Sequence, residues 1–76
     1  MLESARPQDV LSPREVQVLE CASLGLTNAE IAQRLDVTVH AVKFHLGAIY
    51  RKLAVSNRTK AVGLYLRTTS LGQESG

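Results

Sequence analysis

Apolar residues recur with a helical period in the second half of the chain. The repeating positions are Val39, Val42, Leu46, Ile49 and Leu53. Their alternating steps of three and four residues place them along one side of an α-helix. We therefore predict a helix of about four turns over residues 39–53, with these side chains as its buried stripe. Because an isolated helix of this length is only marginally stable in water, the rest of the chain must supply its packing partners.

Two helix-start signals precede this stripe. Ser12 is followed by a proline and, three residues later, by Glu15, and Thr27 is followed at the same spacing by Glu30. A Ser or Thr cap with a Glu three residues on satisfies two backbone N–H groups, and proline suits the first helical position. Glycine after the first segment and aspartate after the second favour the left-handed conformation that ends a helix. We predict these two helices over residues 13–24 and 28–35.

A fourth helix is indicated beyond residue 53. Ser56 or Asn57 can cap it, and its apolar positions extend to about Leu66. No segment alternates in the way that a strand would. The predicted fold class is thus all-α with four helices. We expect residues 1–10 to be a flexible linker, residues 11–67 to be the folded domain and residues 68–76 to be a flexible tail, because both ends lack sustained periodicity.

Size and composition exclude several classes of protein. A chain of 76 residues forms one small domain and has little room for a deep catalytic cleft. The single cysteine, Cys21, can form no internal disulfide and stands without further metal ligands, so we expect a reducing, cytoplasmic location and no metal site. There is no membrane-spanning run of apolar residues. Because paired carboxylates, a Cys/His/Asp set and a glycine-rich phosphate loop are also missing, we expect neither an enzyme nor a cofactor.

Charge is unevenly distributed along the chain. The net charge is +2, but no acidic residue occurs from Val37 to Gln73, a stretch that contains six of the nine basic residues. Such segregation suggests a surface that faces a polyanion, although a solvated helical face without acids would look the same.

The predicted second and third helices, joined by a turn of about three residues, have the arrangement of a helix-turn-helix, whose second helix enters the major groove of DNA. On the side of the third helix away from its buried stripe, periodicity places His40, Lys43, Phe44, Gly47, Ala48 and Arg51. Lys43 could reach guanine or a phosphate, and Phe44 could contact a thymine methyl group. An alternative for Phe44 is that it folds back against the second helix or the domain edge. For Gly47 and Ala48 the alternative is a thin surface without a partner. His40, Arg51, Lys52 and Arg58 are candidates for phosphate contacts, with solvated charges as the alternative.

Five stretches of the chain resemble the LuxR-type (GerE-like) DNA-binding domain of bacterial transcription regulators. They are Leu11–Glu15, Gly25–Ala32, Val42–Leu46, Ile49–Leu53 and Asn57–Val62. The resemblance implies a four-helix domain that binds double-stranded DNA. It places Lys43, Phe44 and Gly47 at base-contacting positions, and Thr27, Thr38, His45 and Lys52 near the sugar-phosphate backbone. It also implies a homodimer through the fourth helix, for which Val62 and Leu66 are our candidates, with core packing as the competing explanation.

The chain departs from the family pattern at four positions. Gly47 stands where many members carry a polar or basic residue, and Ala48 stands where Asn is frequent. Base readout could therefore be sparse or based on DNA shape. Ala54 replaces the glycine that usually ends the third helix, which would tighten the turn or extend the helix. Lys60 replaces a usual acidic residue of the fourth helix and adds positive charge.

Two functions are therefore compared. The first is sequence-specific binding of double-stranded DNA in the control of transcription, by a dimer with residues 39–53 in the major groove. The second is a helix-turn-helix used as a docking module for another regulator or for RNA polymerase, through Phe44 and the small residues nearby. The dependence of binding on salt distinguishes them, because only phosphate contacts release counterions.

Overall fold

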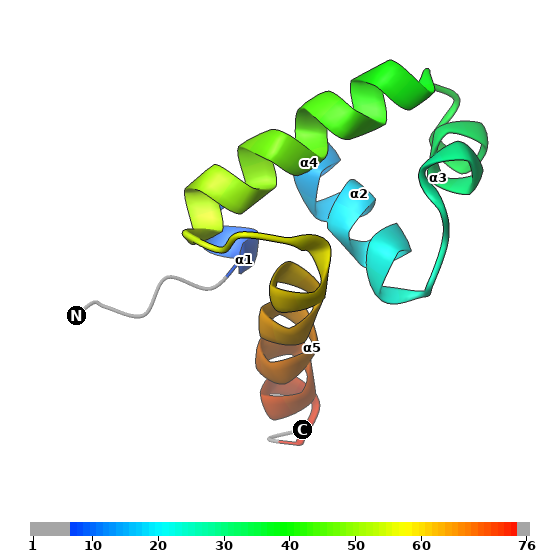
Figure 1. Ribbon diagram of the computed structural model, residues 1–76. Coiled ribbons are helices and arrows are strands. Elements are labelled where there is room, and N and C mark those ends of the chain that lie inside the picture. Colours follow the sequence, from blue (N-terminus) through cyan, green and yellow to red (C-terminus); the bar gives the residue numbers. More distant parts are fainter. Residues whose placement is uncertain (1–6, 75–76) are drawn as a thin grey trace.

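The computed structural model describes residues 7–74, and within that range it contains helices and no strand. The helices are α1 (Pro7–Val10), α2 (Pro13–Ser23), α3 (Asn28–Leu35), α4 (Val39–Leu53) and α5 (Arg58–Glu74). Four of them have eight residues or more, and α1 is a single turn. The predicted all-α, four-helix architecture is confirmed, and α3 and α4 form the helix-turn-helix (Figure 1).

Both predicted capping boxes are present. The Ser12 hydroxyl accepts a hydrogen bond from the Glu15 backbone N–H at 3.2 Å, and Glu15 Oε1 accepts one from the Ser12 N–H at 2.8 Å. Thr27 and Glu30 repeat the exchange at 3.1 and 2.8 Å. Each pair satisfies two N–H groups that the first turn of a helix leaves without a partner. Helices α2 and α3 consequently begin where the sequence predicted.

The turn between α3 and α4 is fixed by backbone geometry. Asp36 adopts the left-handed conformation, with φ of 59° and ψ of 47°, and the N–H of Val37 donates to the carbonyl of Ala32 at 2.9 Å. Thr38 then caps α4, because its hydroxyl oxygen accepts from the N–H of Ala41 at 3.0 Å. These contacts close α3 and open α4 within three residues, as expected of a helix-turn-helix.

The hydrophobic core lies between α2, α3, α4 and the start of α5. Its fully buried side chains include Val18, Leu19, Ile31, Val42 and Ile49. The core fixes the direction of α4, which contacts each of the other four helices. The buried side of α4 therefore cannot turn without losing apolar contacts with all of them.

Three residues differ from the predicted burial. Ala48 was placed on the outer face of α4 but is only 7% exposed, because helices pack on α4 over a wider arc than its apolar stripe. Val39, expected in the stripe, is 39% exposed, since it is the first residue of the helix and lies outside the core cluster. Leu24, expected in the stripe of the first helix, is exposed because α2 ends at Ser23 and Leu24 is only its C-cap.

The helix α4 ends at Leu53 and is not extended by the alanine that follows. Ala54 adopts the left-handed conformation, with φ of 57°, and the N–H of Val55 donates to the carbonyl of Tyr50 at 3.0 Å. Asn57 then caps α5, because its Oδ1 accepts from the N–H of Lys60 at 2.9 Å. The residue in this left-handed conformation carries a Cβ, which raises the energy of that backbone conformation.

Both ends of the fold are longer than predicted. The expectation of a flexible linker over residues 1–10 is wrong for its last part, since Pro7–Val10 form α1 and the Pro7 side chain is buried. The expectation of a tail from residue 68 is wrong as far as Glu74, because α5 continues without a proline to stop it (Figure 1). Residues 1–6 and 75–76 lie outside the described part of the chain.

Candidate nucleic-acid interface

One side of α4 is free of other helices along the edge of the molecule (Figure 1). His40, Lys43, Phe44 and Arg51 are exposed there, and Gly47 is half-buried among them. We call these five residues the recognition face. Apart from Ala48, the side chains that periodicity assigned to the outside of this helix are thus brought together on one surface. The three-residue turn and the core under α4 hold this surface outward.

Phe44 is the most exposed large hydrophobic residue of the described chain, at 68%. Its ring meets the ring of His45 edge-on, with centroids 5.8 Å apart and an interplanar angle of 69°. The alternative in which Phe44 folds back onto α3 is wrong, because a ring buried there could not be this exposed. An aromatic ring held in water loses hydrophobic stabilisation that a partner surface could restore.

Gly47 leaves a gap in the recognition face. Apart from the neighbouring backbone of α4, a Cβ added at this position would meet one atom within 4 Å. This is Nη1 of Arg51 at 3.7 Å, which is an ordinary contact distance. No packing within the domain therefore requires glycine here. Instead, the missing side chain keeps α4 thin at the centre of its exposed side, where a nucleic-acid surface could approach closely.

The electrostatics of the recognition face are one-sided. Lys43 and Arg51 are exposed, and α4 has no acidic residue in its first turn and two basic residues in its last. The cations in the last turn also suit the negative end of the helix dipole. The face therefore presents positive charge without a local carboxylate to neutralise it.

Thr27 and Thr38 lie at the N-termini of α3 and α4 and are exposed. Each uses its hydroxyl oxygen as an acceptor for capping, so its hydroxyl hydrogen is still able to donate to a phosphate oxygen. His45 is half-buried beside the recognition face. Thr38 and His45 lie at the turn and in the first half of α4, whereas Thr27 lies at the opposite end of α3 from that turn.

Lys52 is paired within the protein. Its Nζ donates to Oε1 of Glu15 at 2.8 Å, and the side chains are 43% and 8% exposed, respectively. Burial raises the pKa of Glu15, but the hydrogen bonds from Lys52 and Ser12 and the charge of Lys52 outweigh it, so the pKa is lowered overall. Sequence reasoning identified Glu15 only as a capping residue, and no local pattern connects two residues 37 positions apart.

Arg58 is also engaged inside the domain. Its Nη1 donates to the carbonyl of Leu26 at 2.9 Å, and its Nη2 donates to Oδ1 of Asn28. The guanidinium thus connects the first residue of α5 to the loop between α2 and α3. This arrangement fits a structural role for Arg58. From the sequence we had considered only a phosphate contact or a solvated charge.

Residues 9–65 match the family described as bacterial regulatory proteins, luxR family. The chain belongs to the luxR family. The match spans more than half of the chain and covers α2, α3, α4, the recognition face and the first turns of α5. The resemblance that the sequence motifs indicated is therefore confirmed.

Curated relatives of this luxR-family chain are named as transcriptional regulators. The chain is 44% identical to the HTH-type transcriptional regulator AlkS of Alcanivorax borkumensis over 72% of its own length and 6% of the relative. It is 42% identical to the transcriptional regulatory protein ComA of Bacillus subtilis, over 78% of this chain and 28% of that protein. With the transcriptional activator protein ExpR of Pectobacterium parmentieri it shares 42% over 82% and 25%. The chain thus spans well under a third of each of these relatives.

The fifth helix of this luxR-family domain carries the two residues that the sequence analysis put forward for a dimer. Leu66 is 48% exposed and lies outside the core cluster, whereas Val62 is half-buried and packs against it. Core packing thus explains part of the burial of Val62 but not the position of Leu66. Leu66 is the one of the two that is largely free for contact with another molecule.

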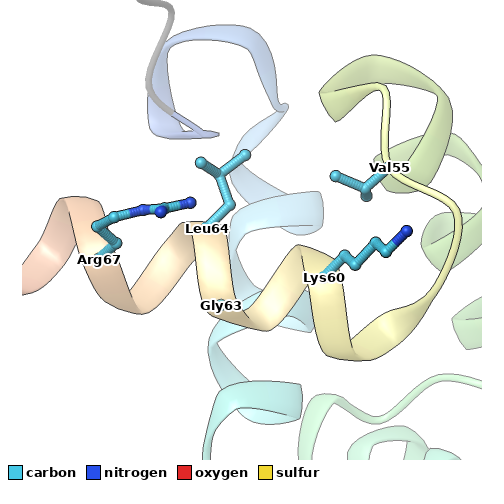
Figure 2. Close-up of a pocket in the computed structure, with 5 residues that line it drawn as sticks. All are labelled: Val55, Lys60, Gly63, Leu64 and Arg67. Carbon is cyan, nitrogen blue, oxygen red and sulfur yellow. The ribbon is translucent and has the colours of Figure 1, made fainter.

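An open depression of about 390 Å³ lies beside α5, away from the recognition face. Figure 2 shows Leu64 between the basic side chains of Lys60 and Arg67, with Val55 on the preceding loop. In this part of the luxR-family domain the lining carries positive charge and no carboxylate.

Among the described residues, no group of three or more His, Cys, Asp or Glu side chains could hold a metal ion. No helix in the described range combines the length and apolar character needed to cross a membrane.

Proposed function

We propose that this domain binds double-stranded DNA with sequence preference in the regulation of transcription, by placing α4 in the major groove. The observation that carries the proposal is the recognition face, which is basic, free of carboxylates and held outward by the turn at Asp36. The major groove is about 12 Å wide and admits an α-helix. The names of the luxR-family relatives as transcriptional regulators support the same function.

Base contacts are proposed for the centre of the recognition face. Lys43 can donate to the O6 and N7 atoms of guanine, and Phe44 can cover a thymine methyl group. Gly47 contributes by allowing the helix backbone to approach the base edges. The exposure of Lys43 and Phe44 supports these roles, because neither side chain is used by the core.

Phosphate contacts are proposed around this centre. Exposed Thr27, Thr38 and His40 and half-buried His45 could position α4 by contacts to the sugar-phosphate backbone. Lys52 could add a contact, because an ammonium group has three donors and only one is used on Glu15. For Arg58 we propose the structural role instead, since two of its donors are already bound within the domain.

A dimer on DNA is proposed through α5, with Leu66 at the centre and Val62 beside it. The depression that Lys60 and Arg67 border is a poor alternative contact, because two copies joined there would bring like charges together. Leu66 is about 100° around the helix from Arg67, so a contact centred on Leu66 leaves that depression uncovered. Two half-sites in the DNA would follow from such a dimer.

A second function remains a candidate because Phe44 is so exposed. The helix-turn-helix could dock onto another regulator or onto RNA polymerase through Phe44 and Gly47. We place either activity in the cytoplasm, where a bacterial chromosome and its polymerase would be accessible.

Binding of duplex DNA at several salt concentrations tests the proposal. We expect affinity to fall log-linearly with salt, and Lys43→Ala to weaken binding by about 1 to 3 kcal/mol while relaxing the preference at one base pair. Amide NMR signals of residues 39–51 should shift when duplex is added. Unmoved signals in α4, or an affinity for a protein partner that barely changes with salt, would favour the docking function instead.

A further inference from the structure

Arg51 lies beside the gap that Gly47 leaves in the recognition face. Its Nη1 atom lies 3.7 Å from the place where a Gly47 Cβ would be. From this geometry we propose that Arg51 reads a base pair, preferentially through guanine, at the level of α4 where Gly47 carries no side chain. The proposal rests on the proposed DNA-binding function and replaces the phosphate contact that the sequence predicted for Arg51.

The reach of Arg51 follows from helix geometry. Arg51 is four positions after Gly47, which is about 6 Å along the helix axis, and side chains in an α-helix lean toward the N-terminus. A long side chain at Arg51 therefore lies back over the turn that contains Gly47. With a bulky residue at position 47, this path would be blocked, so the glycine and the arginine act together.

The guanidinium is also available for a ligand. Arg51 is exposed, and no hydrogen bond or ion pair ties it to another residue of the described chain, in contrast to Lys52 and Arg58. The lack of acidic residues from Val37 to Gln73 removes local carboxylates that could compete for it. A guanidinium above the helix surface can donate two parallel hydrogen bonds to guanine O6 and N7.

Phe44 and Gly47 lie on the same side of α4 as Arg51, which is consistent with contacts from all three to one groove. Phe44 lies two turns before Arg51, and Gly47 lies between them. Phe44 would contact a thymine methyl group, and Arg51 would contact a guanine further along the groove. Because the guanidinium lies back at the level of Gly47, three residues beyond Phe44, the two contacts would be separated by roughly 5 Å along the helix axis, which is about one to two base-pair steps of duplex DNA.

A phosphate contact and a base contact by Arg51 differ in one testable respect. Lysine can replace arginine against a phosphate, because the interaction depends on a point charge. Lysine can also donate to guanine O6 and N7, as proposed for Lys43, but it lacks the fixed planar pair of donors that arginine offers. Arg51→Lys therefore keeps a phosphate contact but weakens the base readout, whereas Arg51→Ala removes both.

The experiment selects bound duplexes from a library with randomised half-sites, and then measures the affinity of the wild-type chain and its variants for single-base changes in the best site. We expect Arg51→Ala to lose about tenfold of the preference for guanine at one position, and Arg51→Lys to lose part of that preference while retaining the affinity for an unrelated duplex within about twofold. Gly47→Gln should reduce preference at the same position, because it obstructs the path of Arg51. Arg67→Lys, on α5, is the matched control and should leave every preference unchanged.

The outcomes separate this inference from the function on which it rests. If Arg51→Ala weakens every sequence equally and no base preference is lost, Arg51 contacts phosphate and the inference is overturned while DNA binding stands. If the wild-type chain binds no duplex, or binds all duplexes equally, both fail. Circular dichroism of each variant confirms that the helices are intact, which is expected for substitutions at exposed positions.

Discussion

The Nζ atom of Lys52, near the end of α4, lies 2.8 Å from Oε1 of Glu15 at the start of α2. Glu15 is nearly buried and also belongs to the capping box of α2, since the same oxygen accepts from the Ser12 N–H. The pair therefore joins the N-terminus of α2 to the helix that carries the recognition face. It fixes α4 at the end opposite to the turn at Asp36.

Replacement of Lys52 tests the contribution of this pair to stability. Lys52→Met leaves the Glu15 carboxylate without its counter-charge, and we expect the free energy of unfolding to fall by about 1 to 2 kcal/mol. This range is below that for a fully buried pair, because Lys52 is 43% exposed and water screens its charge. Urea denaturation measures the change. Arg67→Met, at an exposed position, should stay within about 0.5 kcal/mol of wild type, and an equal effect of both would show that the pair stabilises nothing.

The lowered pKa of Glu15 makes stability depend on pH. A carboxyl whose pKa is lower in the folded chain than its ordinary value of 4.5 contributes stability that is fully present above that value. The contribution disappears as the pH falls through the lower folded pKa. The difference in unfolding free energy between wild type and Glu15→Gln should therefore shrink on acidification below pH 4.5. Denaturation at a series of pH values measures it, and a constant difference would contradict the assignment.

Glycine at position 54 should stabilise the domain. Ala54 has φ of 57°, where its Cβ is unfavourable, and this strain exceeds the extra backbone entropy of a glycine. We expect Ala54→Gly to raise the free energy of unfolding by about 0.5 to 1 kcal/mol. Thermal denaturation should show the increase. Ala29→Gly, inside α3, is the control and should lower stability by up to about 1 kcal/mol.

Arg58 should prove structural. Arg58→Met removes the hydrogen bonds to Leu26 and Asn28, and we expect it to lower the free energy of unfolding by about 1 to 2 kcal/mol. The dependence of DNA affinity on salt should keep its slope. A phosphate contact would instead reduce that slope by about 1, so the two roles are separated by binding titrations at several salt concentrations.

Phe44→Ala should affect binding but not folding. Because the ring is 68% exposed, its removal should change the free energy of unfolding by less than about 0.5 kcal/mol. The affinity for a selected duplex should fall by about 1 kcal/mol, which corresponds to the apolar area that the ring would bury against a base. A mobility-shift titration checks the loss. If affinity is unchanged and a protein partner binds more weakly, the docking function gains support.

Local interactions explain how much of the fold the sequence predicted. Capping boxes, a left-handed residue at Asp36 and the three-four spacing of α4 all act between residues at most five positions apart. The beginnings of α2, α3 and α4 were therefore predictable, as was the outward direction of Lys43 and Phe44. The burial of Ala48 was not, because a periodic stripe does not show how wide an arc the neighbouring helices cover.

Local sequence patterns are enough to predict an all-α chain with a helix-turn-helix and a basic, carboxylate-free outer side of α4. Which of the charges are free for a partner depends on the packing of distant helices. Lys52 and Arg58 are engaged with residues 37 and 32 positions earlier, and Arg51 lies over Gly47 without such a partner. Spacing within one helix sets the direction of a side chain. The packing of distant helices decides what that side chain meets.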